Sequence, residues 1–132
     1  MGAAINLINS FKVKTVIFNC GRYNYLERKL IKVLKKKRIP YYSCIDELNL
    51  SQYNLQFLNT KEYDNENDNS NVIYLNYDNY QFLFMGDAGI EKEKDILDAY
   101  SLEDIDFLKV GHHSSNISSS EDFINVLIQT IV

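Results

Sequence analysis

The sequence predicts a single α/β domain that spans residues 1–132. Short segments rich in β-branched and aromatic residues alternate with amphipathic, helix-like segments along the chain. Several of the strand-like segments are apolar at nearly every position, which is typical of a sheet covered on both faces. The chain is also long enough to bury a core, because a domain of this size removes roughly two thirds of its unfolded surface from water.

The N-terminal part contains, in chain order, the end of a helix at 3–9, a strand at 14–20, a helix from residue 24 and a strand at 41–45. The first strand, KTVIFNC, is short and apolar, and Gly21 closes it. Asn24 and Glu27 have the spacing of a capping box, which predicts the start of the helix. Pro40 predicts its end.

The central part contains three predicted strands, at 53–59, 71–77 and 80–86. The acidic and polar stretch 60–69 predicts a surface loop before the last two of them. Asp78-Asn79 lies between those two strands and predicts a hairpin. Both strands of the hairpin are apolar almost throughout, so we expect other elements to cover each face of this sheet.

The C-terminal part contains a predicted helix at 89–100, a strand at 105–110 and a final helix. Ser118 and Glu121 have the S-x-x-E spacing of a capping box. We therefore expect Ser118 to cap the final helix, with Ser119 and Ser120 in its first turn.

Composition limits the class of function. The formal net charge of −4 argues against a broad basic surface for nucleic acid. Cys20 and Cys44 form neither a C-x-x-C pair nor a disulfide framework, so we predict two free thiols in a reducing compartment. The N-terminus lacks the charge order of a secretory signal, and no apolar run approaches the ~20 residues that span a bilayer. These features predict a soluble, cytoplasmic chain.

Two polar side chains follow successive predicted strands, at the edge of the sheet where ligands collect in α/β proteins. Asp87 follows the strand 80–86 within GDAG, and His112 follows the strand 105–110 within GHH. A carboxylate with an imidazole suits a divalent ion such as zinc, manganese or iron. Neighbouring side chains of an extended segment point in opposite directions, so we predict His112 as the ligand and His113 as a residue that faces substrate or supports the site.

Each of these features also has an ordinary structural explanation. A Gly-Asp pair after a strand is common in turns, and paired histidines at a strand end can be a surface feature. Their combination in this order is more specific than either feature alone.

The segment NDNSNVIYLNYDNYQFLFMGDAG, followed by DIDFLKVGHHSSNISSSEDF, resembles the metallo-β-lactamase-like domain of the ComEC/Rec2 competence protein family. That family has N-x-S, an apolar hairpin, T-G-D and L-K-V-P-H-H-G-S. The positions that match are Asn69 and Ser70, Gly86 and Asp87, and the run from Leu108 to Ser115. The N-terminal part INLINSFKVKTVIFNC is also similar to the family, so the resemblance covers nearly the whole chain.

The resemblance implies an αββα sandwich with one or two divalent ions, zinc or manganese, that activate water for hydrolysis. Asp87 and His112 would be metal ligands, and His113 would assist catalysis. Asn69, Ser70 and Ser115 would contact the substrate or orient the site. The substrate would be a phosphodiester, in this family DNA during uptake, and family members are membrane-anchored.

The resemblance is incomplete. The superfamily's main ligand motif, H-x-H/D-x-D-H, would fall before Met1, and the strand expected after the last helix is reduced to QTIV. Gly111 also replaces the usual proline, and Ser114 the usual glycine. We therefore expect a partial domain, truncated at both ends, with weak metal binding and little activity.

Two other interpretations stay open. The chain could be a non-catalytic interaction module or a degenerate relic of the enzyme. The second is direct nucleic-acid binding through RKLIKVLKKKR, residues 28–38, although a solvated amphipathic face explains that segment better.

Overall fold

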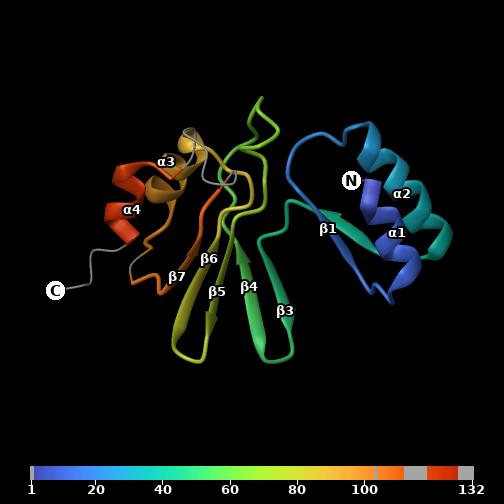
Figure 1. Ribbon diagram of the computed structural model, residues 1–132, viewed down its shortest axis with the longest axis horizontal. Coiled ribbons are helices and arrows are strands. Elements are labelled where there is room, and N and C mark those ends of the chain that lie inside the picture. The colour runs from blue at the N-terminus through green and yellow to red at the C-terminus, as the bar shows by residue number, and fades with distance from the viewer. Residues whose placement is uncertain (1, 103, 112–118, 128–132) are drawn as a thin grey trace.

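The computed structural model describes residues 2–102, 104–111 and 119–127 (Figure 1). Within these ranges the α/β class is confirmed, because helices are combined with a two-stranded and a five-stranded sheet. In chain order the elements are α1 (Gly2–Ser10), β1 (Val16–Phe18), α2 (Tyr25–Lys37), β2 (Tyr41–Ser43), β3 (Glu47–Leu50), β4 (Tyr53–Phe57), β5 (Ile73–Tyr77), β6 (Tyr80–Phe84), α3 (Ile90–Ala99), β7 (Phe107–Lys109) and α4 (Glu121–Leu127).

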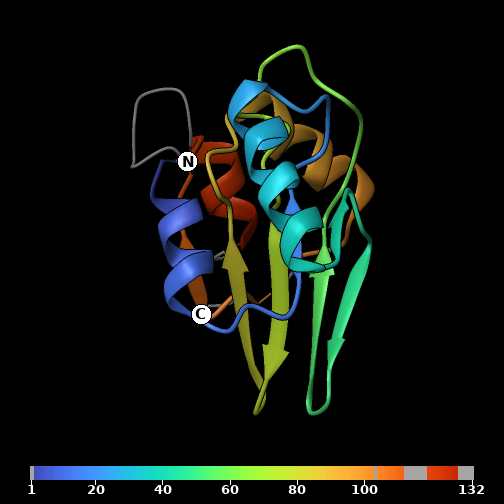
Figure 2. The same cartoon turned by 90° about the vertical axis from the view of Figure 1, so that its right-hand side faces the viewer.

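The N-terminal unit consists of α1, α2 and the parallel pair β1–β2, in which Val16 lies opposite Tyr41 (Figures 1 and 2). The predicted capping box of α2 is confirmed: the Glu27 N–H donates to Asn24 Oδ1, and the Asn24 N–H donates to Glu27 Oε2. The unit has its own apolar core, formed by Ile8, Phe18, Leu30, Ile31 and Leu34.

The second sheet has the order β3-β4-β5-β6-β7, antiparallel except for the parallel pair β6–β7. The predicted hairpin between β5 and β6 is confirmed, and both Asp78 and Asn79 have positive φ, as a type I′ turn requires. β3 (Glu47–Leu50) was not predicted. It is a short edge strand that alternates polar and apolar residues, and among the described strands it pairs only with β4.

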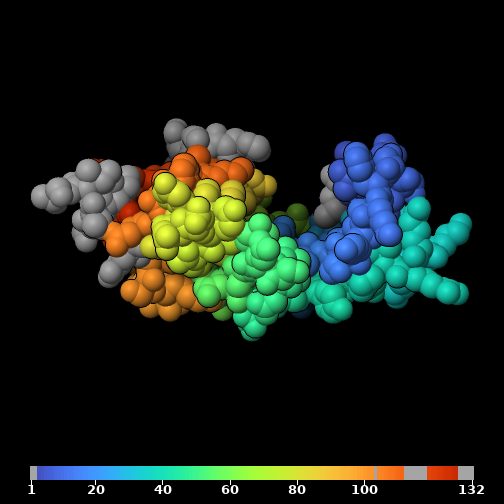
Figure 3. Space-filling model, turned by 90° about the horizontal axis from the view of Figure 1, so that it is seen from below, coloured from blue at the N-terminus to red at the C-terminus, as the bar shows by residue number. Residues whose placement is uncertain are grey.

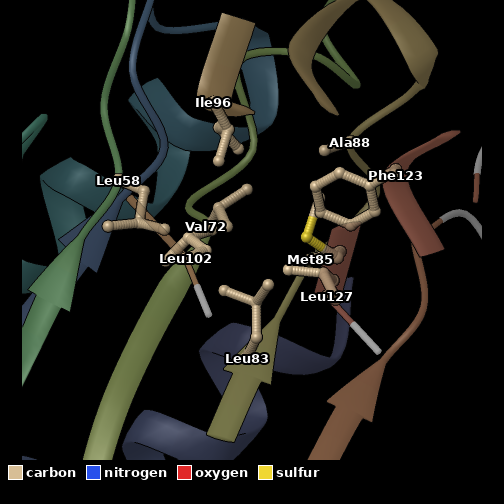
Figure 4. Packing of buried hydrophobic residues seen from close by; sticks show 9 residues of the cluster. All are labelled: Leu58, Val72, Leu83, Met85, Ala88, Ile96, Leu102, Phe123 and Leu127. Carbon is tan, nitrogen blue, oxygen red and sulfur yellow. The ribbon is translucent and has the colours of Figure 1, made fainter. Parts of the chain in front are cut away.

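The helices α3 and α4 pack against one face of this sheet and enclose the larger core (Figure 4). Ile96 of α3 and Phe123 of α4 are buried against Leu83 of β6. The other members of the cluster are Leu58, Val72, Met85, Ala88, Leu102 and Leu127.

The opposite face of the sheet is apolar and, apart from the buried Phe57, half-buried or exposed, so the expectation that both faces are covered is wrong for the described residues. Tyr80, Phe82 and Phe84 alternate along β6 onto this face. Phe107 of β7 stacks on Phe82, with ring centroids 4.8 Å apart. Tyr80 and Phe107 are 52% and 53% exposed. The strands are apolar as predicted, but both helices that follow the hairpin pack on the same side of the sheet.

The prediction of free cysteines is also wrong, because Cys20 and Cys44 form a disulfide. β1 and β2 run parallel with Phe18 opposite Ser43, so the residues just after both strands lie at the same end of the sheet. The two Cα atoms are 4.5 Å apart, within the range that a disulfide spans.

The start of α4 differs from the prediction. The helix begins at Glu121, and the Ser120 hydroxyl accepts the Phe123 N–H, so Ser120 is the cap and Ser119 precedes the helix. Ser118 lies outside the described residues. None of the helices in the described ranges is both long and apolar enough to cross a membrane.

Candidate functional site

The parallel pair β6–β7 places the segments after both strands at the same edge of the sheet. Phe84 lies opposite Lys109, and the Met85 N–H donates to the Lys109 carbonyl over 3.1 Å. Asp87 follows Phe84 by three residues, and His112 follows Lys109 by three. The register therefore brings the Asp87 turn and the end of the described segment at Gly111 to the same edge of the sheet.

Gly111 gives direct evidence for this convergence, because its backbone lies against the residue that follows Asp87. A Cβ added to Gly111 would lie 2.4 Å from the Ala88 carbonyl oxygen. The site therefore requires glycine here, where the family that the sequence resembles has proline. Asp87 is exposed, whereas His112, His113 and Ser115 lie outside the described residues.

Gly86 allows the Asp87 turn to approach the segment that holds Asn69 and Ser70. Its φ is +61°, and an added Cβ would lie 3.0 Å from both Ser70 Cβ and the Asn71 carbonyl. The structure thus brings three of the predicted site residues, Asp87, Asn69 and Ser70, to one pocket.

Asn69 holds the predicted loop 60–69 in place. It is buried, and its Oδ1 accepts the Tyr63 N–H over 2.9 Å while its Nδ2 donates to the Tyr63 carbonyl over 2.6 Å. Its carbonyl accepts the Cys20 N–H, which ties this loop to the end of β1. Both ends of the side-chain amide are therefore engaged within the protein, so Asn69 fixes the loop that lines the pocket.

Lys92 is a buried cation beside this loop that the sequence did not single out. Its Nζ donates to the Ser70 carbonyl over 3.0 Å and lies 5.6 Å from the Tyr63 ring centroid. Burial lowers the pKa of Lys92 to about 8, although the nearby Asp68 and Asp95 act to raise it. Lys92 fixes the backbone of Ser70, one of the predicted site residues.

Two buried carboxylates fix the neighbouring segments. Asp68 Oδ1 accepts the N–H of Gly89, the residue just before α3. The Glu93 carboxylate accepts the N–H groups of Ser119 and Ser120, the latter over 2.9 Å. The close approach of Gly111 to the Ala88 carbonyl, and the hydrogen bonds of Ser119 and Ser120 to the Glu93 carboxylate, thus fix the described residues on either side of 112–118.

Sequence reasoning could not find Lys92 and Glu93. They belong to a run of alternating charges on α3, EKEK, in which Glu91 and Lys94 are exposed. The only signal was their position one turn before the buried Ile96, on the side of the helix that faces the core.

The pocket has a volume of about 510 Å³ and lies between the carboxyl end of β1 and the Asp87 turn. Its charged lining is mostly acidic, with one guanidinium against five carboxylates: Arg22, Glu27, Glu62, Asp64, Glu66 and Asp87. An acidic pocket attracts cations and repels phosphodiesters unless a cation neutralises it. Within the described residues, however, no group of three or more His, Cys, Asp or Glu could hold a metal ion.

The chain is similar to ComE operon protein 3 of Bacillus subtilis (strain 168), with 28% identity over 134 residues. The match covers 96% of this chain, which spans 17% of the length of that protein. No family model matches the chain. The similarity supports a relation to a competence protein.

Proposed function

We propose that this chain is part of a metal-dependent hydrolase domain with a metallo-β-lactamase-like fold. Its substrate is a phosphodiester, such as DNA during uptake. The similarity to ComE operon protein 3 over 96% of the chain supports the connection with competence.

The observation that carries the proposal is the convergence of Asp87 with the chain that leads into His112. The β6–β7 register and the contact between Gly111 and Ala88 bring these two segments together at one edge of the sheet. A carboxylate and an imidazole presented there would bind a divalent ion, which would supply an activated water and neutralise a phosphodiester.

The acidic pocket and the sheet give independent support. Five carboxylates around the pocket favour a cation as the first ligand. The five-stranded sheet has helices on one face and apolar side chains such as Phe82 and Phe107 on the other. One half of an αββα sandwich would have such a sheet, with its apolar face packed on a second sheet, so this feature supports the proposal.

The metal site would be incomplete with these donors alone. A catalytic zinc ion needs about three protein ligands besides its water. Asp87 and His112 supply two, and Asp87 is the only one of them within the described residues. We therefore expect weak metal binding by this chain.

The test is a calorimetric titration of Zn²⁺ and of Mn²⁺ into the 132-residue chain. Asp87→Ala and His112→Ala should each abolish binding. The matched control is Asp64→Ala, which removes another exposed carboxylate of the same pocket and should leave binding unchanged. Binding that survives in both Asp87→Ala and His112→Ala would refute the proposed site.

Hydrolysis of bis(p-nitrophenyl) phosphate with added metal measures activity directly, and we expect little turnover. Rapid turnover that Asp87→Ala removes would show a more complete site, with further ligands supplied by the chain or by a second copy.

The exposed sheet face favours a second candidate, a non-catalytic interaction module. Tyr80, Phe84 and Phe107 present aromatic surface that soluble monomers rarely leave uncovered. For a module of this kind, Phe107→Ser should reduce self-association in sedimentation velocity, and neither Zn²⁺ nor Mn²⁺ should bind.

A further inference from the structure

The charges of this chain are strongly segregated along the sequence. Residues 1–40 contain ten Lys and Arg and a single acidic residue, Glu27, which gives a formal charge of +9. Residues 41–132 contain four Lys and seventeen Asp and Glu, which gives −13, and together these make the net −4. All ten basic side chains of the first group are exposed, and none forms an ion pair within the described residues.

Six of these basic residues gather at one end of the N-terminal unit, which we name the basic end. Because Val16 pairs with Tyr41, the residues before β1 and before β2 lie beside each other. Val13 and Ile39 also pack on the same apolar core. The basic end consists of Lys12, Lys14, Lys35, Lys36, Lys37 and Arg38.

The basic end lies away from the candidate site. β1 and β2 are parallel, so their amino ends carry the basic end, while the pocket is lined by Asn19 and Cys20 just after β1. Figures 1 and 3 show that α1 and α2 form one end of the long axis of the molecule, opposite α3 and α4. A ligand of the basic end would therefore not occupy the pocket.

Exposed apolar side chains accompany these charges. Leu7 and Phe11 are 55% and 68% exposed. The N–H of Phe11, the residue just after α1, donates to the Leu7 carbonyl, so Phe11 extends the face of the helix that carries Leu7. Lys12 follows Phe11 directly. Apolar side chains beside lysines are typical of surfaces that enter the interface of an anionic membrane.

We propose that the basic end, with Leu7 and Phe11, binds the surface of an anionic lipid membrane. This inference is independent of the proposed hydrolase function. Five of the six basic residues are lysines, which act as point charges, whereas bidentate phosphate recognition favours arginine. A flat surface also touches only this end, while a long nucleic acid lying across the molecule would meet the part of the chain that carries −13.

A structural role explains only some of these charges. Lys35, Lys36 and Lys37 occupy the last turn of α2, where they complement the helix dipole. Lys12 and Lys14 lie outside any helix, so the dipole does not account for them. The membrane proposal accounts for all six residues and for the exposed Phe11.

The test is co-sedimentation of the 132-residue chain with vesicles of phosphatidylcholine and phosphatidylglycerol in a 3:1 ratio. We expect binding in dilute buffer, little binding to pure phosphatidylcholine, and loss of binding in concentrated NaCl. The triple variant Lys35→Gln, Lys36→Gln, Lys37→Gln should bind about 100-fold more weakly, since each basic residue contributes a factor of about 5. Phe11→Ser should weaken binding about 10-fold.

The matched control compares Lys36→Gln with Lys94→Gln, because both remove one exposed helical lysine but only Lys36 belongs to the basic end. Lys94→Gln should leave vesicle binding unchanged. Failure to bind anionic vesicles, or equal binding by the triple variant, would overturn the proposal. Salt-dependent binding of a 30-bp duplex, lost in the triple variant and without vesicle binding, would assign the basic end to nucleic acid instead and would also overturn it.

Discussion

The buried ammonium of Lys92 makes the stability of this protein depend on pH in a defined direction. Its side chain is only 1% exposed, and burial lowers its pKa in the folded protein from the ordinary 10.5 to about 8. Below pH 8 the lysine is charged in both the folded and the unfolded states, and its burial opposes folding. Between pH 8 and 10.5 the folded state loses the proton that the unfolded state retains, so the free energy of unfolding rises with pH.

The magnitude follows from the two pKa values. The difference between 8 and 10.5 corresponds to about 3 kcal/mol, most of which is gained between pH 7 and pH 10. Above pH 10 Tyr63 acts in the opposite direction, because burial and its hydrogen bond to Asp95 raise its pKa to about 12. The effect of Lys92 on the free energy of unfolding can therefore be measured up to about pH 10.

Urea unfolding followed by circular dichroism at pH 7, 8, 9 and 10 measures this dependence. In Lys92→Met the rise of about 2–3 kcal/mol should disappear. At pH 7 this variant should be no less stable than the wild type, because the loss of a desolvated charge offsets the lost hydrogen bond to Ser70. Lys94→Met, on the exposed side of the same helix, should keep the rise. If the free energy of unfolding depended on pH in the same way in the wild type and in Lys92→Met, the reasoning would be refuted.

Three further predictions concern stability, each measured by urea unfolding. In the double variant Cys20→Ser, Cys44→Ser the free energy of unfolding should fall by about 3.5 kcal/mol, because the unfolded chain is no longer constrained by a loop of 24 residues. Reduction of the wild-type disulfide should have the same effect. Equal stability of the reduced and oxidised proteins would contradict this. Gly111→Ala should lower the free energy of unfolding by about 1–3 kcal/mol, because its Cβ would overlap the Ala88 carbonyl. An unchanged urea midpoint would contradict a close contact between these two residues. Glu93→Gln should lower the free energy of unfolding by about 1–3 kcal/mol, because a buried carboxylate that accepts two N–H groups would become an amide. The control is Glu91→Gln, which changes an exposed carboxylate of the same helix.

Local patterns predicted the elements that local interactions determine. The capping box of Asn24 and Glu27 and the turn at Asp78 and Asn79 each depend on a few neighbouring residues, and both were correct. Ser118 with Glu121 was a similar pattern, but Ser120 caps the helix instead. With three consecutive serines available, spacing alone does not determine which one caps.

Long-range features could not be predicted from the sequence, because they depend on how the elements pack. The Cys20–Cys44 disulfide requires β1 and β2 to be parallel neighbours, and the burial of Lys92 requires knowing which side of α3 faces the loop at Ser70. Asp87, Asn69 and Ser70 were predicted as site residues and do line one pocket. The roles of Asp87 and His112 in metal binding stay predictions that the titration tests.

The separation of charge between residues 1–40 and 41–132 also affects how copies of the protein meet. A molecule with +9 on one part and −13 on the other has a large electric dipole moment, despite its modest net charge of −4. Copies therefore attract one another head to tail when the ionic strength is low. The attraction weakens as salt shortens the Debye length, which is about 10 Å at 0.1 M. Concentrated stocks should accordingly be clearer in moderate salt than in dilute buffer.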